Sequence, residues 1–186
     1  MEVKKTYCET VRDLELSNLH RIYHDTQYGF PIESDNELFG RLLLEINQAG
    51  LSWTTILNKQ ENFRKAYADY DIATVAAFNE QDKERLLNDK GIIRNRLKVK
   101  AAIFNANKIL ELQYEFSSFK NWLDEQHPKE RKEWVKLFKK TFKFTGGEIT
   151  NEFLLSTGYL PGAHVKGCPI YDKVLEKKPK WYAEPL

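Results

Sequence analysis

The chain has 186 residues, with 29 Lys and Arg against 27 Asp and Glu, which gives a formal charge of +2 at pH 7. This length favours a single domain with a sizeable core, for which 4 Trp, 9 Tyr and 11 Phe supply bulky side chains. A charge this small does not by itself indicate a polyanion partner, so any nucleic-acid surface must come from local clusters of basic residues.

Membrane and secretory signals are missing from the sequence pattern. No apolar run approaches the length of a membrane span, and the N-terminal residues lack a secretory apolar stretch. We therefore expect a cytoplasmic protein that has no membrane partner. In that compartment Cys8 and Cys168 are expected to be thiols or metal ligands rather than a disulfide.

Hydrophobic spacing predicts helices along most of the chain. Residues 1–16 show no clear periodicity, and the next segment predicts a short helix with Leu19, Ile22 and Tyr23 inward. Further helices are predicted over 34–50, 53–70 with a break near Asn58, 72–78, 79–87, a long segment that reaches about Phe116, 119–126, 130–141, and a last segment that Gly158 ends. No strand alternation is evident, so the predicted fold is all-α. The tail from Pro169 is expected to be loosely packed.

The first long helix contains one acid within an apolar run. Ser34 opens this helix with a capping-box pattern, and apolar residues lie one turn before and one turn after Glu45. Its carboxylate should therefore point at or beside buried surface. Ser52 is the expected cap of the next helix and places Trp53 in its first turn. A half-buried carboxylate beside an indole can hold a flat, cationic ring, but pattern alone favours a boundary Glu paired with Arg or Lys.

Two basic clusters are candidates for a nucleic-acid surface. The first opens the long helix and consists of Arg94, Arg96, Lys98 and Lys100; a solvated helix end explains it equally well. The second surrounds the glycine turn between two helices, where exposed amides and a helix N-terminus can hold a phosphate; it consists of Lys132, Lys136, Lys139, Lys140 and Lys143. A plain helical hairpin is the commoner meaning of this spacing, and Glu148 would repel a phosphate.

Four potential metal ligands can converge: Cys8, His24, His164 and Cys168. His164 and Cys168 are four positions apart, which is a plausible spacing for a zinc pair, and two Cys with two His would bind zinc tetrahedrally. Four protein ligands leave no open position, so such a zinc would be structural and would tie the chain ends together. By residue type alone, isolated His and Cys side chains are more often packing residues, and His20 is a rival to His24.

Taken together, five segments resemble the 3-methyladenine DNA glycosylase I family. They lie at 23–29, 44–57, 91–98, 142–146 and 164–168. The resemblance as a whole runs from about Cys8 to Cys168. The stretches Gln-Ala-Gly-Leu-Ser-Trp and Gly-Ile-Ile-Arg-Asn-Arg are the most specific. The family has Glu-Trp-Gly at the positions where this chain has Gln27, Tyr28 and Gly29, so a smaller phenol forms one wall of the implied pocket.

The resemblance implies an all-α helix-hairpin-helix DNA glycosylase-like bundle, with one domain over 1–186, a core at about 8–168 and a tail at 169–186. It implies a monomer with one structural zinc per chain. The implied reaction is hydrolysis of the glycosidic bond of 3-methyladenine in double-stranded DNA after base flipping. This reaction releases free 3-methyladenine and leaves an abasic site.

The resemblance also implies the site residues, position by position. The zinc ligands are Cys8, His24, His164 and Cys168. Glu45 is the catalytic residue, and the base is held by Tyr23, Tyr28 and Trp53. The DNA backbone is met by Lys143, Thr145, Gly146 and Gly147. In the family an aromatic residue is usual where His20 stands, so His20 and Tyr28 both depart from the pattern. Two alternatives therefore stay open: a non-catalytic module that binds lesion DNA, and a glycosylase with a different alkyl-base preference.

Overall fold

The computed structural model describes residues 5–182, and no strand occurs among them. The all-α prediction is therefore confirmed for this part of the chain. The contacts divide the chain into two compact units, which we call the terminal unit (1–31 and 154–186) and the central unit (32–153). That residues 1–186 form a single domain stays a prediction.

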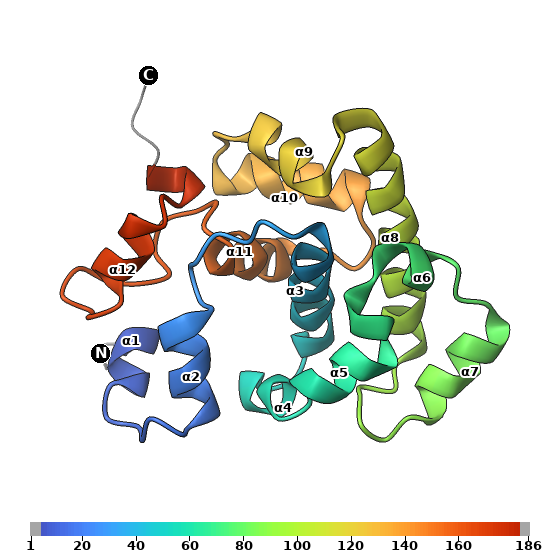
Figure 1. Ribbon diagram of the computed structural model, residues 1–186, viewed down its shortest axis with the longest axis horizontal. Coiled ribbons are helices and arrows are strands. Elements are labelled where there is room, and N and C mark those ends of the chain that lie inside the picture. Colours follow the sequence, from blue (N-terminus) through green and yellow to red (C-terminus); the bar gives the residue numbers. More distant parts are fainter. Residues whose placement is uncertain (1–4, 183–186) are drawn as a thin grey trace. The chain divides into compact units, whose positions relative to one another are not determined.

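The terminal unit contains short helices from both ends of the chain. They are α1 (Tyr7–Val11), α2 (Leu19–Thr26), the last residues of α11 (Gly147–Ser156), α12 (Tyr171–Glu176) and the 3₁₀ helix η2 (Lys180–Tyr182) (Figure 1). A capping box between Thr6 and Glu9 starts α1, although the sequence showed no periodicity there. In α2 the inward prediction is correct for Tyr23, which is buried, and wrong for Leu19 and Ile22, which are exposed.

The tail is ordered as far as Tyr182, so the expectation of loose packing is wrong for residues 169–182. Ile170 and Val174 lie four residues apart and join Cys8 and Cys168 in one buried apolar cluster. The backbone N–H of Trp181 then donates to the carbonyl of Gly158 at 3.3 Å. Two apolar residues at helical spacing thus anchor a segment that is rich in Lys and Pro. Residues 183–186 lie outside the described residues.

The central unit contains the remaining helices. They are α3 (Asp35–Gln48), α4 (Trp53–Leu57), α5 (Gln60–Ala66), the 3₁₀ helix η1 (Ala68–Tyr70), α6 (Ile72–Ala76), α7 (Glu80–Asn88), α8 (Arg96–Phe116), α9 (Phe119–Gln126), α10 (Arg131–Thr141) and the first residues of α11. The predicted break near Asn58 is the boundary between α4 and α5, and Asn58 itself is the C-cap of α4.

Two contacts fix the helix α3 within the central unit. The Asp35 carboxylate accepts hydrogen bonds from the backbone N–H groups of Phe119 at 2.7 Å and of Lys120 at 2.9 Å, so it satisfies free amides at the start of α9. One turn further on, Gly40 faces the Tyr70 ring so closely that a Cβ atom there would lie 2.3 Å from a ring carbon. These contacts hold the helix that carries Glu45.

An aromatic core supports the helical hairpin formed by α10 and α11. Phe119 stacks on Trp122 with centroids 5.9 Å apart, and Phe138 lies 5.3 Å from Phe142 and 5.5 Å from Phe153. Aromatic pairs in such offset or tilted arrangements add stability beyond the apolar area they bury. The two helices of the hairpin are therefore packed together through buried aromatic side chains.

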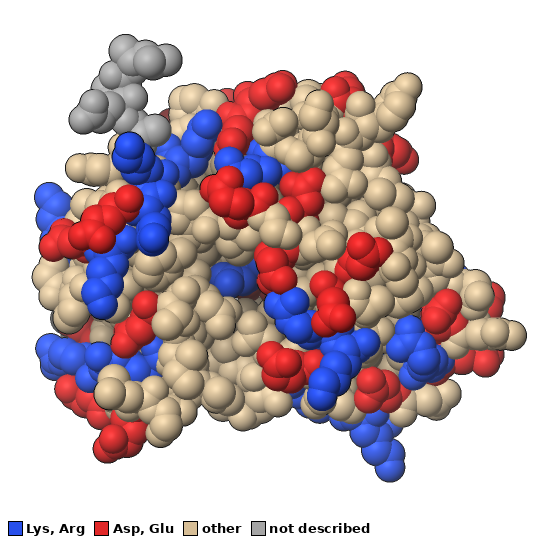
Figure 2. All heavy atoms as spheres, viewed as in Figure 1, with Lys and Arg blue, Asp and Glu red and all other residues tan. Residues whose placement is uncertain are grey.

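Hydropathy and surface charge bear on the partners that the described residues can meet. In the described part of the chain no helix is both long enough and apolar enough to cross a membrane. On the face drawn in Figure 2, Lys and Arg are interspersed with Asp and Glu. On this face, cations are therefore available to a nucleic acid only as local groups.

Candidate functional site

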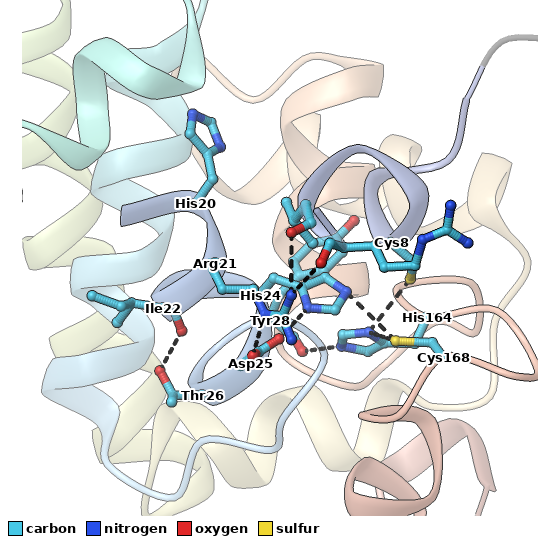
Figure 3. Close-up of polar contacts among 12 residues, drawn as sticks. Cys8, His20, Arg21, Ile22, His24, Asp25, Thr26, Tyr28, His164 and Cys168 are labelled. Carbon is cyan, nitrogen blue, oxygen red and sulfur yellow. Dashed lines mark hydrogen bonds and ion pairs between the residues drawn. The ribbon is translucent and has the colours of Figure 1, made fainter. Parts of the chain in front are cut away.

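The four predicted metal ligands converge in the terminal unit. Their donor atoms all lie within 4.8 Å of one another. Cys8 comes from α1 and His24 from α2, while His164 and Cys168 come from the segment between α11 and α12 (Figure 3). The rival His20 is not in the cluster; its Nδ1 lies 3.0 Å from the Tyr7 hydroxyl. The structure therefore brings together the set that includes His24.

Three sulfur–nitrogen distances in the cluster are close to those of a tetrahedral zinc site. Sγ of Cys168 lies 3.7 Å from Nε2 of His24 and 3.6 Å from Nδ1 of His164, and Sγ of Cys8 lies 3.7 Å from that Nδ1. Zinc–sulfur bonds of about 2.3 Å and zinc–nitrogen bonds of about 2.0–2.1 Å separate a sulfur and a nitrogen ligand by roughly 3.6 Å in a tetrahedron. The cluster is also a donor set of two thiols and two imidazoles, which suits zinc.

Each histidine is oriented by a hydrogen bond on its other ring nitrogen. Nδ1 of His24 lies 2.7 Å from a carboxylate oxygen of Asp25, and Nε2 of His164 lies 2.7 Å from the carbonyl oxygen of Tyr28. Both acceptors require an N–H on that nitrogen, so the nitrogen that faces the cluster carries a lone pair. Asp25 is in turn held by Arg21 at 2.6 Å.

Burial adjusts the pKa values of the cluster residues. It raises the pKa of the Cys8 thiol and lowers the pKa of His164, because a charge is poorly solvated there. A neutral imidazole is the ligand form of histidine, and a bound cation favours the thiolate. A cavity of about 240 Å³, lined by Cys8, His24 and Cys168 among others, borders the cluster.

Glu45 is buried within α3, with 4% of its surface exposed. Burial raises the pKa of its carboxyl to about 8; the nearby Arg41 lowers it and Glu152 raises it. No ion pair involves Glu45 among residues 5–182, so the paired boundary acid that pattern alone favoured is not what the structure shows. An acid this well buried is neutral at pH 7 until a cation approaches it.

Trp53 follows α3 after a tight turn. Gly50 has a φ of +81°, a left-handed conformation that glycine adopts without strain, and Ser52 caps α4 by accepting a hydrogen bond from the N–H of Thr55 at 3.3 Å. Trp53 is the first residue of α4 and is half-buried. The helix cap was predicted correctly.

Tyr23 and Tyr28 are neighbours in the terminal unit, with ring centroids 5.6 Å apart. Both are buried, and Tyr7 packs against each of them. Sequence reasoning missed Tyr7, because residues 1–16 have no helical periodicity. Glu45 and Trp53 belong to the central unit, so the convergence of all four residues on one base stays a prediction.

The hairpin loop between α10 and α11 has an inner and an outer side. The Thr145 hydroxyl is buried and donates to the Phe138 carbonyl at 3.0 Å, so its role is to shape the loop. A Cβ atom added at Gly146 or Gly147 would meet no heavy atom of the described residues within 4 Å. The Lys143 ammonium lies 5.1 Å from the centroid of the Phe104 ring. The glycines and Lys143 therefore form the outer side.

The basic cluster at the start of α8 is not one surface. Arg94, Arg96 and Lys100 are exposed, whereas Lys98 is 4% exposed. Its ammonium donates to the carbonyl oxygens of Asn47 and Ala49, each at 2.8 Å. Sequence reasoning missed this role, because an amphipathic pattern does not reveal which lysine a helix end will bury.

Comparisons with known proteins agree with the resemblance. A family model described as methyladenine glycosylase matches residues 14–136. DNA-3-methyladenine glycosylase 1 of Escherichia coli (strain K12) is 36% identical over 172 residues, which cover 82% of this chain and 91% of that protein.

Solved structures are similar as well. The structure that describes 3-methyladenine recognition by 3-methyladenine DNA glycosylase I from Staphylococcus aureus is 30% identical, with a TM-score of 0.75 over 84% of this chain and 93% of that one. A variant of 3-methyladenine DNA glycosylase I in complex with 3-methyladenine is 29% identical, with a TM-score of 0.76 over 84% and 94%. From the matched residues and the shared fold, the chain belongs to the methyladenine glycosylase family.

Proposed function

We propose that the protein is a DNA-3-methyladenine glycosylase, a monofunctional enzyme that removes the cationic base from alkylated DNA. The observation that carries the proposal is Glu45, a buried acid on α3 whose pKa burial raises to about 8. The family match supports the same activity, and it covers both Glu45 and Trp53. An acid that lacks an ion pair is costly in a core, and a cationic ligand compensates this cost.

The reaction follows from the charge of the substrate. Methylation at N3 makes adenine cationic, and this weakens the bond between N9 and C1′ of the deoxyribose. When that bond breaks, its electron pair neutralises the ring, so the leaving group is neutral 3-methyladenine. The oxygen of a water molecule bonds to C1′ and its proton goes to solvent, which leaves an abasic site. The enzyme must mainly extract the nucleotide and hold the cation.

Glu45 distinguishes a cationic purine from a neutral one. While its carboxyl is neutral it offers hydrogen bonds but no negative charge to a base, whereas a cation beside it lowers its pKa and favours the carboxylate. The carboxylate then accepts hydrogen bonds from the base edge and stabilises positive charge as the glycosidic bond breaks. Unmodified adenine carries no charge and so does not draw the proton from Glu45.

The aromatic residues supply stacking. We assign Trp53, Tyr23 and Tyr28 to the faces and rim of the extracted base, where each stacking contact contributes roughly 1–3 kcal/mol. Trp53 is half-buried at the start of α4. Tyr28 has a smaller ring than the tryptophan usual at its position, which leaves room for bases with other alkyl groups.

The hairpin loop is the proposed grip on the DNA backbone. Lys143 contributes a cation, Gly146 and Gly147 expose backbone amides, and Thr145 holds the loop in shape from inside. Glu148 lies in the first turn of α11 and pairs with Arg131 at 2.6 Å. This ion pair reduces the repulsion that the Glu148 carboxylate would exert on a phosphate.

We assign Cys8, His24, His164 and Cys168 to one structural zinc per chain. The closeness of the four donor atoms supports this assignment. The family match adds nothing to it for three of the four residues, because they lie outside the matched range. A zinc with four protein ligands would stabilise the terminal unit by joining α1 and α2 to the segment 164–168. We also propose a monomer that acts on double-stranded DNA in the cytoplasm.

The direct test identifies the bases that the protein releases from a methylated duplex. Chromatography should show free 3-methyladenine with wild-type protein, and Trp53→Ala should release it more slowly while Trp53→Phe, which keeps an aromatic face, retains most of the rate. Tight binding to lesion DNA with no released base over a long incubation would instead identify a non-catalytic binding module. Release of a different alkylated base as the main product would change the proposed substrate.

A further inference from the structure

The buried Lys98 on α8 has no part in the function proposed above. We propose that Lys98 is a positioning residue for base excision: it fixes the end of α3, between Glu45 and Trp53, to the helix that also fixes the DNA-binding hairpin. This inference rests on the proposed function.

Lys98 grips the backbone at the point where α3 ends. Its Nζ atom donates to the carbonyls of Asn47 and Ala49, each at 2.8 Å, and Ala49 is the C-cap of α3. These carbonyls have no partner within the helix, and a cation stabilises this negative end of the helix dipole. Glu45 lies two residues before the first carbonyl, and Trp53 lies four residues after the second.

The same helix holds the hairpin loop through Asn105. The Asn105 side chain donates to the carbonyl of Lys143 at 3.1 Å and accepts from the N–H of Lys143 at 2.8 Å, and it is 1% exposed. Residues 98 and 105 are seven positions apart, close to two helical turns, so they lie on one face of α8. The Lys98 ammonium also lies 5.9 Å from the centroid of the ring of Phe144, at the hairpin.

Through these contacts α8 holds two parts of the central unit, which are the end of α3 and the hairpin loop between α10 and α11. Lys98 holds the turn between α3 and α4 that leads to Trp53, and Asn105, about two helical turns further along α8, holds the hairpin loop. Lys98 itself is buried, so it is not available to a phosphate as its exposed neighbours Arg96 and Lys100 are. Loss of the Lys98 charge should therefore disturb the base site and leave the affinity for undamaged DNA unchanged.

The experiment compares four variants of the full chain. Lys98→Met removes the charge at similar length, and Lys98→Arg retains it. Asn105→Ala removes the hairpin contacts. Lys108→Met is the matched control, since Lys108 lies on α8 and pairs with the surface residue Glu111. Three quantities are measured: kcat and KM for release of 3-methyladenine from a duplex, the Kd for free 3-methyladenine by quenching of tryptophan fluorescence, and the salt dependence of binding to undamaged duplex.

We expect Lys98→Met to lower kcat about 10- to 100-fold and to weaken free-base binding, because small misplacements at a reacting site have effects of this size. Its duplex Kd and salt slope should match those of the wild type, and Lys98→Arg should recover most of kcat. Asn105→Ala should show the opposite split, with weaker duplex binding and an unchanged Kd for the free base. Lys108→Met should behave as the wild type.

Two results would overturn the inference. One is a Lys98→Met protein with normal kcat and normal free-base binding. The other is a loss confined to duplex affinity with a salt slope lower by about 0.9, which would make Lys98 a phosphate contact. If circular dichroism shows that Lys98→Met is unfolded, Lys98→Gln, which keeps a neutral donor, replaces it under the same criteria. A wild type that releases no base would refute the proposed function instead, and the free-base Kd would still report on Lys98.

Discussion

Nδ1 of His164 lies 3.7 Å from Sγ of Cys8, although 156 positions separate the two residues in the chain. The same nitrogen lies 3.6 Å from Sγ of Cys168. A zinc bound here would join a helix near the N-terminus to a segment near the C-terminus. Its binding free energy would then become folding free energy of the terminal unit, on the order of 10 kcal/mol at neutral pH.

Removal of one ligand should release the metal. Elemental analysis of the purified protein should show about one zinc per chain, and Cys168→Ala should lower both the zinc content and the melting temperature. His20→Ala is the control, since His20 is a histidine on the same helix as His24 but outside the cluster. A zinc-free wild type that is fully stable in the presence of a strong chelator would refute the metal assignment.

The outer hydrogen bond of His24 should also affect the metal. Asp25→Ala removes the carboxylate that lies 2.7 Å from Nδ1 of His24, so the imidazole loses its orientation and some of its basicity. Zinc affinity should fall about 10- to 100-fold, as measured by competition with a chromophoric chelator. Asp13→Ala, which removes an exposed acid of the same unit, should leave the affinity unchanged; equal effects of the two substitutions would contradict this role.

The metal cluster shows what sequence can and cannot predict. The pair His164 and Cys168 is visible as a local spacing, but the choice between His20 and His24 depends on which face of an eight-residue helix is turned inward. Leu19 and Ile22 suggested one face by hydrophobicity, and the structure exposes both. Tyr23, on the buried face of α2, packs against Tyr7, and such packing between segments is not encoded in the periodicity of either one.

Glu45 should make the stability of the protein depend on pH. Its pKa is raised by burial from 4.5 to about 8, so the folded state holds a proton that the unfolded state releases in this range. The stability of the wild type should therefore fall as the pH rises from about 4.5 to about 8. Glutamine does not ionise, so Glu45→Gln does not lose this stability as the pH rises. It should be more stable than the wild type by on the order of 3 kcal/mol at pH 7, with little difference near pH 4.5.

Urea unfolding at pH 5 and pH 7.5 measures this difference. Glu61→Gln is the control, because Glu61 is an exposed acid on α5. An equal midpoint for Glu45→Gln and the wild type at both pH values would show that Glu45 is not held neutral by burial.

Lys143 should contribute to binding of any duplex, whatever its sequence or damage. Lys143→Ala removes one cation from the hairpin loop, so affinity should fall and the slope of log K against log salt should decrease in size by about 0.9. Lys83→Ala removes a lysine that is paired with Glu80 on α7 and should change neither quantity. A Lys143→Ala protein with an unchanged salt slope would place the phosphate contacts elsewhere.

The hairpin and α8 illustrate a second limit of sequence reasoning. The helix α9 was predicted with its observed bounds, Phe119–Gln126, and α10 within one residue, because caps and apolar spacing mark them locally. The role of Lys98 was not predictable, since four basic residues at the start of α8 look alike in sequence. Only the approach of α3 determines which ammonium is buried against its last carbonyls.

The central claim is that Glu45 stabilises a cationic purine as its bond to deoxyribose breaks. The most direct test is the single-turnover rate of 3-methyladenine release from a duplex at pH 7, with enzyme in excess, for the wild type and for Glu45→Gln. We predict release by the wild type and a rate at least about 100-fold lower for the folded variant. Equal rates for the two proteins would contradict the claim.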